Sequence, residues 1–257
     1  MIKEGERILL VGRDGKRFFF VIEKKMIEVR GLGVVDGSAV CQRSLGDLLR
    51  IGESEFTVLK PSISDLLSNL DRKAQIMIPK DSFPIPLRLN LGSGDTVIEA
   101  GVGSGALALV LLKTVAPSGR VISYEVRKDH AELARRNVSM SEHASCWDLR
   151  LEDVCTATLP ENPDAAMLDM PNPWDALVNV MRALRPGGYV GCFVPNANQL
   201  ESTVTKMREI GLEEIVSFET LQREMVVHAG GVRPSFDMLG HTGYLAFGRK
   251  MKRDLAI

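Results

Sequence analysis

The stretch that decides the fold of this 257-residue chain is Glu99-Ala-Gly101-Val-Gly103-Ser-Gly105. It lies between a β-rich run, Thr96-Val-Ile-Glu-Ala, and a helical run that begins at Ala106. Glycines at such a turn let the backbone bend tightly and approach a ligand, while N–H groups at the start of the helix face it. The alternate glycine spacing differs from the dinucleotide pattern GxGxxG. Either pattern alone is weak evidence for a ligand, because the turn can need glycine for its own geometry.

Outward from this turn, strand and helix patterns alternate over residues 66–257. The helix after the second strand is expected to begin with Asp129 and Glu132 at capping-box spacing. The alternation predicts an α/β fold with a doubly wound, mostly parallel, Rossmann-like sheet covered by helices on both faces. The strand patterns fall at 96–100, 120–125, 148–151, 164–169 and 189–194, with two closing strands at 215–218 and 244–247.

Residues 1–65 have a different pattern of short β-rich runs. Arg13-Asp-Gly-Lys16 has the composition of a tight hairpin turn between two of them. We therefore expect two domains: a small N-terminal β-barrel-like domain over residues 1–65 and the α/β domain over residues 66–257.

Composition gives little support for a nucleic-acid partner. The 32 basic and 33 acidic side chains leave a net charge of −1, without the positive excess that nucleic-acid binders often show. The basic run 249–253 is more typical of a solvated chain end, although basic residues from several subunits could still form a positive groove.

The sequence predicts a cytoplasmic protein without a membrane span or a metal. The longest apolar run, Ala106 to Leu112, is too short to span a bilayer, and charges occupy the N-terminal stretch where a signal peptide would be apolar. The cysteines form no CxxC pair and have no histidine at zinc spacing, which favours free thiols and no metal site. They are Cys41, Cys146, Cys155 and Cys192.

Acidic residues follow the second and third strands, at the sheet edge where ligands bind in open α/β folds. Glu125 is placed to accept hydrogen bonds from two ribose hydroxyls. Asp153 could accept from an adenine amino group while the backbone N–H of Val154 donates to the ring. An exposed strand-end glutamate and a solvated acidic loop are the alternative interpretations.

The loop Leu168-Asp169-Met-Pro-Asn-Pro-Trp174 ends the fourth strand. The need to end a strand and begin a helix explains its two prolines. It does not explain an aspartate at the ligand-facing end of a strand with a large aromatic side chain nearby. We therefore expect this loop to serve the chemistry.

Several segments together resemble the tRNA (adenine-58-N1)-methyltransferase family of the TrmI type, over residues from about 70 to 250. The glycine turn is common to class I methyltransferases and discriminates little, whereas the other segments are much more specific. These are Gln75-Ile-Met-Ile-Pro-Lys-Asp81, Ser123-Tyr-Glu125, Leu168 to Trp174, Asn198-Gln199 and Gly240-His-Thr-Gly-Tyr-Leu245.

The resemblance implies a class I fold, S-adenosylmethionine as cofactor, the tRNA T-loop as substrate and a homotetramer. Asp169 and Trp174 are the implied catalytic residues. The implied substrate-binding residues are Ile78, Pro171, Gln199, Arg223 and His241. The implied cofactor-binding residues are Gln75, Glu99, Gly101, Gly103, Ser104, Gly105, Ala106, Glu125, Val126, Asp153, Val154 and Asp169.

Ile78 departs from the family pattern, in which Tyr or His precedes the proline of the PKD segment. The choice of substrate is therefore less secure than the cofactor, and three alternatives stand beside N1 methylation of adenine 58. One is a methyltransferase with another acceptor, such as a protein carboxylate or a small metabolite. The others are an NAD-dependent oxidoreductase, which the glycine spacing disfavours, and a non-catalytic tRNA-binding subunit, which the intact cofactor residues disfavour.

Overall fold

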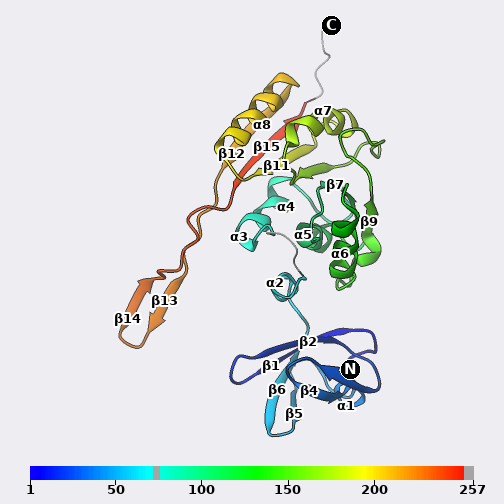
Figure 1. Ribbon diagram of the computed structural model, residues 1–257, viewed down its shortest axis with the longest axis vertical. Coiled ribbons are helices and arrows are strands. Elements are labelled where there is room, and N and C mark those ends of the chain that lie inside the picture. The colour runs from blue at the N-terminus through cyan, green and yellow to red at the C-terminus, as the bar shows by residue number, and fades with distance from the viewer. Residues whose placement is uncertain (72–75, 252–257) are drawn as a thin grey trace. The chain divides into compact units, whose positions relative to one another are not determined.

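The computed structural model describes residues 1–71 and 76–251, and the chain divides into two compact units, Met1–Asn69 and Leu70–Ile257 (Figure 1). Residues 72–75 and 252–257 lie outside the described part.

The first unit is an antiparallel sheet of order β2-β1-β6-β5 with a separate β3–β4 hairpin, built around one apolar core. The predicted turn between β1 and β2 is confirmed, with Gly15 at φ +80°. The unit runs to Asn69, because helix α2, which Ser62 and Asp65 cap and which the Asp65–Arg17 pair ties to β2, continues to Ser68. Its elements are β1 Arg7–Gly12, β2 Arg17–Val21, β3 Met26–Val29, β4 Gly33–Asp36, α1 Gly37–Cys41, β5 Leu48–Ile51, β6 Ser54–Leu59 and α2 Ile63–Ser68.

The second unit contains a seven-stranded sheet of order β12-β15-β11-β10-β7-β8-β9. Strands β7 to β11 run parallel, and β15 is antiparallel to both of its neighbours. The doubly wound, mostly parallel α/β prediction is thus confirmed. The helices are α3 Pro79–Ser82, α4 Pro84–Arg88, α5 Ala106–Val115, α6 Lys128–Val138, the short 3-10 turn η1 Ala144–Cys146, α7 Pro173–Ala183 and α8 Ala197–Glu209. The strands are β7 Thr96–Ala100, β8 Arg120–Tyr124, β9 Trp147–Arg150, β10 Ala165–Leu168, β11 Tyr189–Val194, β12 Leu212–Phe218, β13 Met225–His228, β14 Gly231–Pro234 and β15 Tyr244–Lys250.

The core explains why the central strands read as continuous apolar runs. Every residue of β10 is buried, as expected for a parallel strand covered on both faces. Helices α7 and α8 pack together over one face, where Leu177 and Met207 join Ile98 and Leu168 in one cluster. Helix α5, with eight buried residues out of ten, packs with α6. Two helical layers therefore hold the strand ends in fixed positions.

The predicted start of α6 is wrong. The N-cap is Arg127, with no side-chain capping bond, and Asp129 lies inside the first turn. An acidic residue there still stabilises the helix through its dipole, so its presence near the start did not identify the cap.

A long excursion between β12 and β15 was not predicted. The chain leaves the sheet after Phe218, forms the β13–β14 hairpin, and returns at Tyr244 (Figure 1). The short β-branched run Met225-Val-Val-His and the Gly230-Gly231 pair that follows it were the available signals for a hairpin.

No helix in the described ranges is long and apolar enough to cross a membrane. The four cysteines are present as free thiols, with Cys192 buried in the core and the other three partly buried.

Candidate active site

A shallow pocket of about 40 Å³ lies where the carboxyl ends of β7 and β10 meet. Parallel strands end at the same edge of the sheet, so the glycine turn after β7 and Asp169 after β10 are neighbours there. The pocket is lined by Ile76, Met77, Gly101, Val102, Gly103, Ser104, Ala106, Leu107 and Asp169. Five of the predicted cofactor residues thus share one cavity.

Glycine is required at two positions of the turn. Gly103 has φ +54° and its N–H donates to Glu125 Oε2 at 3.2 Å. Gly105 has φ +82°, and a Cβ there would lie 2.8 Å from Val138 Cγ2 of α6. Both φ values are unfavourable for other residues, so the glycines set the path of the backbone past the ligand.

Glu125 directly follows β8 and is held in position from two sides. Its side chain is 6% exposed, and its second oxygen accepts from the N–H of Arg127 at 2.9 Å. A carboxylate oxygen has more than one lone pair, so these bonds orient the group and leave acceptor capacity for hydroxyls. This is the geometry expected of a carboxylate that binds ribose hydroxyls.

Glu99, the last but one residue of β7, is fully buried beneath the turn. Burial raises the pKa of this carboxyl from 4.5 to about 8, against the effect of the Ser123 hydroxyl, which donates to Oε2. Ser123 in turn accepts from Trp147 Nε1 at 2.8 Å. Glu99 is therefore largely protonated near neutral pH.

Two buried polar atoms near the glycine turn have no hydrogen-bond partner among the described residues: Glu99 Oε1 and Ser104 Oγ. Ser104 lines the pocket itself. Buried polar atoms in proteins are normally paired, so the Ser104 hydroxyl fits a polar ligand in the pocket. Glu99 is 0% exposed and does not line the pocket.

Asp169 begins the loop after β10 and faces the glycine turn. Its backbone is tied to β7 and the turn through Ala100 and Gly101, the latter donating to the Asp169 carbonyl at 3.1 Å. The residue is partly exposed at the pocket, yet desolvation by the surrounding protein raises the pKa of its carboxyl to about 7. The aspartate can therefore change charge within the physiological range.

The loop after β9 carries Asp153 and Val154. Asp153 is exposed and accepts from the N–H of Cys155 at 2.9 Å, while Val154 is buried. Asn179 of α7 fixes this loop by donating to the carbonyls of Val154 and Ala157, at 2.8 and 3.0 Å. Val126, on the neighbouring strand end, is 64% exposed and free to cover a ligand. The arrangement is compatible with the adenine role expected for this loop.

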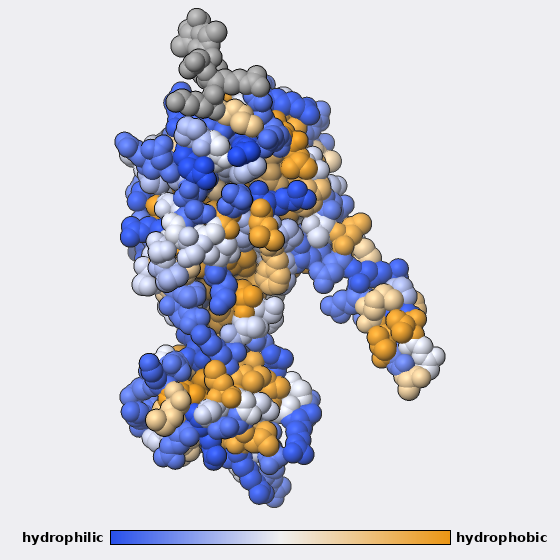
Figure 2. Space-filling model, turned by 180° about the vertical axis from the view of Figure 1, so that it is seen from behind, coloured by the Kyte–Doolittle hydropathy of each residue, from blue (hydrophilic) through white to orange (hydrophobic). Residues whose placement is uncertain are grey.

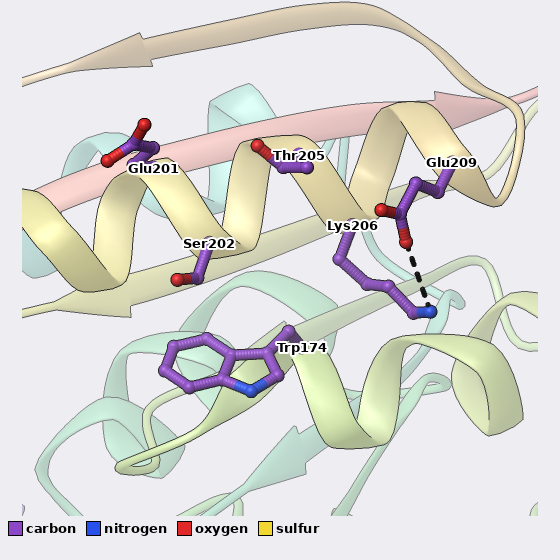
Figure 3. Close-up of a pocket in the computed structure, with 6 residues that line it drawn as sticks. All are labelled: Trp174, Glu201, Ser202, Thr205, Lys206 and Glu209. Carbon is purple, nitrogen blue, oxygen red and sulfur yellow. Dashed lines mark hydrogen bonds and ion pairs between the residues drawn. The ribbon is translucent and has the colours of Figure 1, made fainter.

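The Asp169–Trp174 loop is braced from α8, where Gln199 Nε2 donates to the Pro171 carbonyl at 2.7 Å. Trp174 lies elsewhere: it lines a separate, open groove of about 440 Å³ between α7 and α8 (Figure 3). The indole lies across this groove from Ser202 and from the Lys206–Glu209 ion pair. Trp174 is therefore not among the residues that line the Asp169 pocket.

Ile78, Arg223 and His241 are not among the residues that line this pocket. Ile78 is the N-cap of α3, next to pocket-lining Met77. His241 contacts the chain just beyond β11, through Pro195. Arg223 lies in the excursion and donates to the Ser235 carbonyl at 3.1 Å. Gln75 falls outside the described residues.

Sequence reasoning missed one residue that shapes the site. Asn137 of α6 is 2% exposed, and its Nδ2 donates to the carbonyls of Ser104 and Asp71, both at 2.9 Å. Its Oδ1 accepts from the N–H of Asp71 at 3.2 Å. It thereby joins the glycine turn to the segment that leads into the pocket wall. An asparagine among the apolar positions of a helix was the signal for such a role.

Comparison with known proteins agrees with this geometry. The family described as "tRNA methyltransferase complex GCD14 subunit" matches residues 56–233. The chain is 32% identical to the tRNA (adenine(57)-N(1)/adenine(58)-N(1))-methyltransferase TrmI of Methanocaldococcus jannaschii, over 94% of both chains. It is 31% identical to a tRNA (adenine(58)-N(1))-methyltransferase TrmI of Thermus thermophilus, over 95% of this chain and 97% of the relative.

Two solved structures also match over nearly the whole chain. A protein titled SAM-dependent O-methyltransferase from Thermotoga maritima has a TM-score of 0.85 and 33% identity, covering 98% of this chain and 95% of that one. The tRNA (m1A58) methyltransferase TrmI from Aquifex aeolicus has a TM-score of 0.76 and 30% identity, covering 98% and 99%.

The sheet order, the glycine turn and the strand-end carboxylates define a class I S-adenosylmethionine-dependent methyltransferase. Within that class, the chain belongs to the TrmI-type tRNA (adenine-58-N1)-methyltransferase family.

Proposed function

We propose that this protein transfers the methyl group of S-adenosylmethionine to N1 of adenine 58 in the tRNA T-loop. The observation that carries the proposal is the position of Asp169, which shares one pocket with the glycine turn in a chain of this family. The interpretation as an inactive tRNA-binding subunit is disfavoured, because Glu125 and the turn keep the geometry that a cofactor needs.

The cofactor residues of the proposal are those at the three strand ends. Glu125 would accept from the ribose hydroxyls, Asp153 and Val154 would hold the adenine, and the glycine turn would pass beside the methionine end. Val126 would cover the adenosine, and Ala106 would begin the helix at the turn. The role of Gln75 as part of a cofactor cover stays a prediction, because Gln75 lies outside the described residues. When bound, S-adenosylmethionine supplies an electrophilic methyl carbon.

The chain contributes mainly by placing the acceptor. Adenine N1 carries an in-plane lone pair, so no residue has to remove a proton before attack. Holding two reactants at near-attack distance contributes about 7 to 11 kcal/mol. Asp169 would accept a hydrogen bond from the exocyclic amino group and stabilise the positive charge that methylation creates on the ring.

The target base must leave the stack of the folded RNA, which costs about a few kcal/mol. Pro171, fixed by Gln199, would form one side of the base pocket, and Ile78 the opposite side in place of an aromatic residue. A catalytic role for Trp174 would require a base to reach the α7–α8 groove. An unchanged turnover in Trp174→Ala would remove it from the mechanism.

We propose that the protein works as a homotetramer in the cytoplasm, and the exposed excursion offers a surface for the assembly. The β13–β14 hairpin and its flanking loop expose several large apolar side chains (Figure 2): Met225, Val227, Val232, Phe236 and Leu239. Single exposed apolar residues are common, but a group of them on one segment is typical of a surface that another chain covers. Residues of neighbouring subunits, including Arg223, would then contribute to one tRNA-binding groove.

A second acceptor class follows from the Thermotoga maritima structure, whose title gives an O-methyltransferase. A hydroxyl must lose its proton to become a good nucleophile, and Asp169, with a pKa of about 7, has the basicity for that step. The glycine turn and Asp169 serve either acceptor, so only the product distinguishes the two.

The experiment is transfer of labelled methyl from S-adenosylmethionine to unmodified tRNA, with the product nucleoside identified by mass spectrometry. Appearance of 1-methyladenosine, lost when the T-loop adenine is replaced, supports the proposal. Cofactor binding without transfer to tRNA, together with transfer to a hydroxyl compound in an acceptor screen, would move the acceptor to the second class.

A further inference from the structure

Two sequence motifs that lie far apart in the chain meet in one buried cluster. Lys80 and Asp81 belong to the PKD segment in α3, and Thr242 belongs to the GHTGYL segment before β15. Lys80 Nζ donates to Asp81 Oδ1 at 2.8 Å and to Thr242 Oγ1 at 2.6 Å. Thr242 Oγ1 donates to Asp81 Oδ2 at 2.7 Å and so closes a ring between residues 161 positions apart.

The ring is almost completely shielded from water. The side chains of Lys80 and Asp81 are 6% and 1% exposed. The third N–H of the ammonium donates to the Thr220 carbonyl at 2.7 Å, so every ammonium proton has an acceptor. A buried ion pair with this degree of satisfaction is seldom needed for stability, because apolar residues of similar volume serve as well. Its value is that it fixes one geometry.

The geometry that it fixes is the base of the excursion. Thr220 lies where the chain leaves β12, and Thr242 where it returns towards β15. His241 adds a second clasp, with Nδ1 2.6 Å from Glu219 Oε1 and Nε2 2.8 Å from the Pro195 carbonyl. The segment that leaves β12 and the segment that returns to β15 are thus both anchored at the base of the excursion, beside the end of β11.

The same ring also holds the wall of the pocket. Ile76 and Met77 line the cavity that contains Asp169, and Ile78 caps the short helix that carries Lys80. The pocket wall and the base of the excursion are therefore joined through one ammonium group, although neither belongs to the central sheet.

We propose that Lys80, Asp81 and Thr242 are positioning residues for the acceptor: they hold the 76–78 wall and the 219–243 excursion in one fixed arrangement around the target base. The identity of the acceptor as RNA rests on the proposed function. The joining of the 76–78 wall to the excursion does not. The glycine turn and Glu125 make none of these bonds, although Ile76 and Met77 line the same pocket as the turn.

The test compares Thr242→Val with Thr242→Ser in the full-length protein. Valine keeps the volume and removes the hydroxyl, which both accepts from Lys80 and donates to Asp81. Serine keeps the hydroxyl. Thr114→Val is the matched control, since Thr114 Oγ1 bonds only locally, to the Val110 carbonyl at 3.1 Å within α5.

For Thr242→Val we expect kcat/KM for tRNA to fall between about ten- and a hundredfold, because small misplacements of a binding wall have effects of this size. The Kd for S-adenosylmethionine should rise by a clearly smaller factor than kcat/KM for tRNA falls, and Thr242→Ser should resemble the wild type. Backbone hydrogen exchange should rise in residues 76–83, 219–224 and 240–243 together, and not elsewhere.

Three results would overturn the inference: unchanged tRNA kinetics in Thr242→Val, an equal loss of cofactor and tRNA affinity, or exchange that rises across the whole domain. If the wild-type enzyme methylates no tRNA, the proposed function fails. The exchange pattern still decides whether the ring joins the wall to the excursion.

Discussion

The charge state of Asp169 predicts the pH dependence of turnover. Burial raises the pKa of this carboxyl from 3.8 to about 7, and the proposed mechanism uses the ionised form. The profile of kcat/KM against pH reports the essential groups of the free enzyme. With a pKa of about 7, roughly a tenth of the enzyme is ionised at about pH 6 and nine-tenths at about pH 8.

We therefore expect kcat/KM at subsaturating cofactor to rise about tenfold between about pH 6 and pH 8 and then to level off. Asp169→Asn keeps the shape of the side chain and removes the charge. It should lower kcat/KM about 100- to 1000-fold, as for other groups that stabilise developing charge, and its profile should be flat in this window.

The assay is initial-rate transfer of labelled methyl to tRNA in buffers of constant ionic strength. Glu161→Gln, at an exposed loop position, is the control for pH effects on the RNA and on cofactor stability. A flat wild-type profile, or a rise that persists with the same midpoint in Asp169→Asn, would refute the reasoning, since the titrating group would then be another one.

Three further perturbations test the site and the surface. The pKa of the Glu99 carboxyl is raised from 4.5 to about 8, so the free energy of unfolding of the wild type should fall as pH rises through that range, by up to about 5 kcal/mol. Glu99→Gln has no such carboxyl and should not show this fall. In denaturant unfolding, the variant should therefore be more stable than the wild type only above about pH 6. Equal unfolding curves of the two proteins at every pH would contradict the assignment of Glu99 as a buried acid. Asn137→Ala should weaken cofactor binding more than about tenfold, because three hydrogen bonds to the turn and the wall segment are lost, and calorimetry that shows wild-type affinity would exclude this anchor. Val227→Glu, at a position 71% exposed, should dissociate the proposed assembly in sedimentation while the circular dichroism of the protomer stays that of a folded chain; an unchanged sedimentation coefficient would place the assembly surface elsewhere.

The strand–helix alternation was readable from the sequence because each element carries its own local signal. β7, β8, β10 and β11 carry apolar runs, and glycines or prolines follow β7, β10 and β11 before the next helix. Between β8 and α6 the chain has Glu125-Val-Arg127 instead. The carboxyl-edge positions of Glu125, Asp153 and Asp169 followed from the order of the elements alone. Parallel strands all end at the same edge, so a residue just after a strand has a predictable place.

The start of α6 and the hairpin show where local signals are insufficient. An acidic residue stabilises a helix from any of several positions in its first turn, so the spacing of Asp129 and Glu132 did not show which residue is the N-cap. The hairpin strands are four residues each, with most side chains exposed, and give only a weak alternating pattern. They pair only with each other in a separate two-stranded sheet, so no buried face marks them in the sequence.

The sequence by itself determined the class of fold, the turn that faces the cofactor and the carboxylates around it, because these depend on neighbours in the chain and on strand order. Only the tertiary structure decided that Trp174 faces α8 and not the Asp169 pocket, since the direction of a side chain at a helix start depends on what packs against it. Only the tertiary structure joined Lys80 to Thr242, because a buried charge is compensated by whichever acceptors the fold brings within reach, and these come from remote segments.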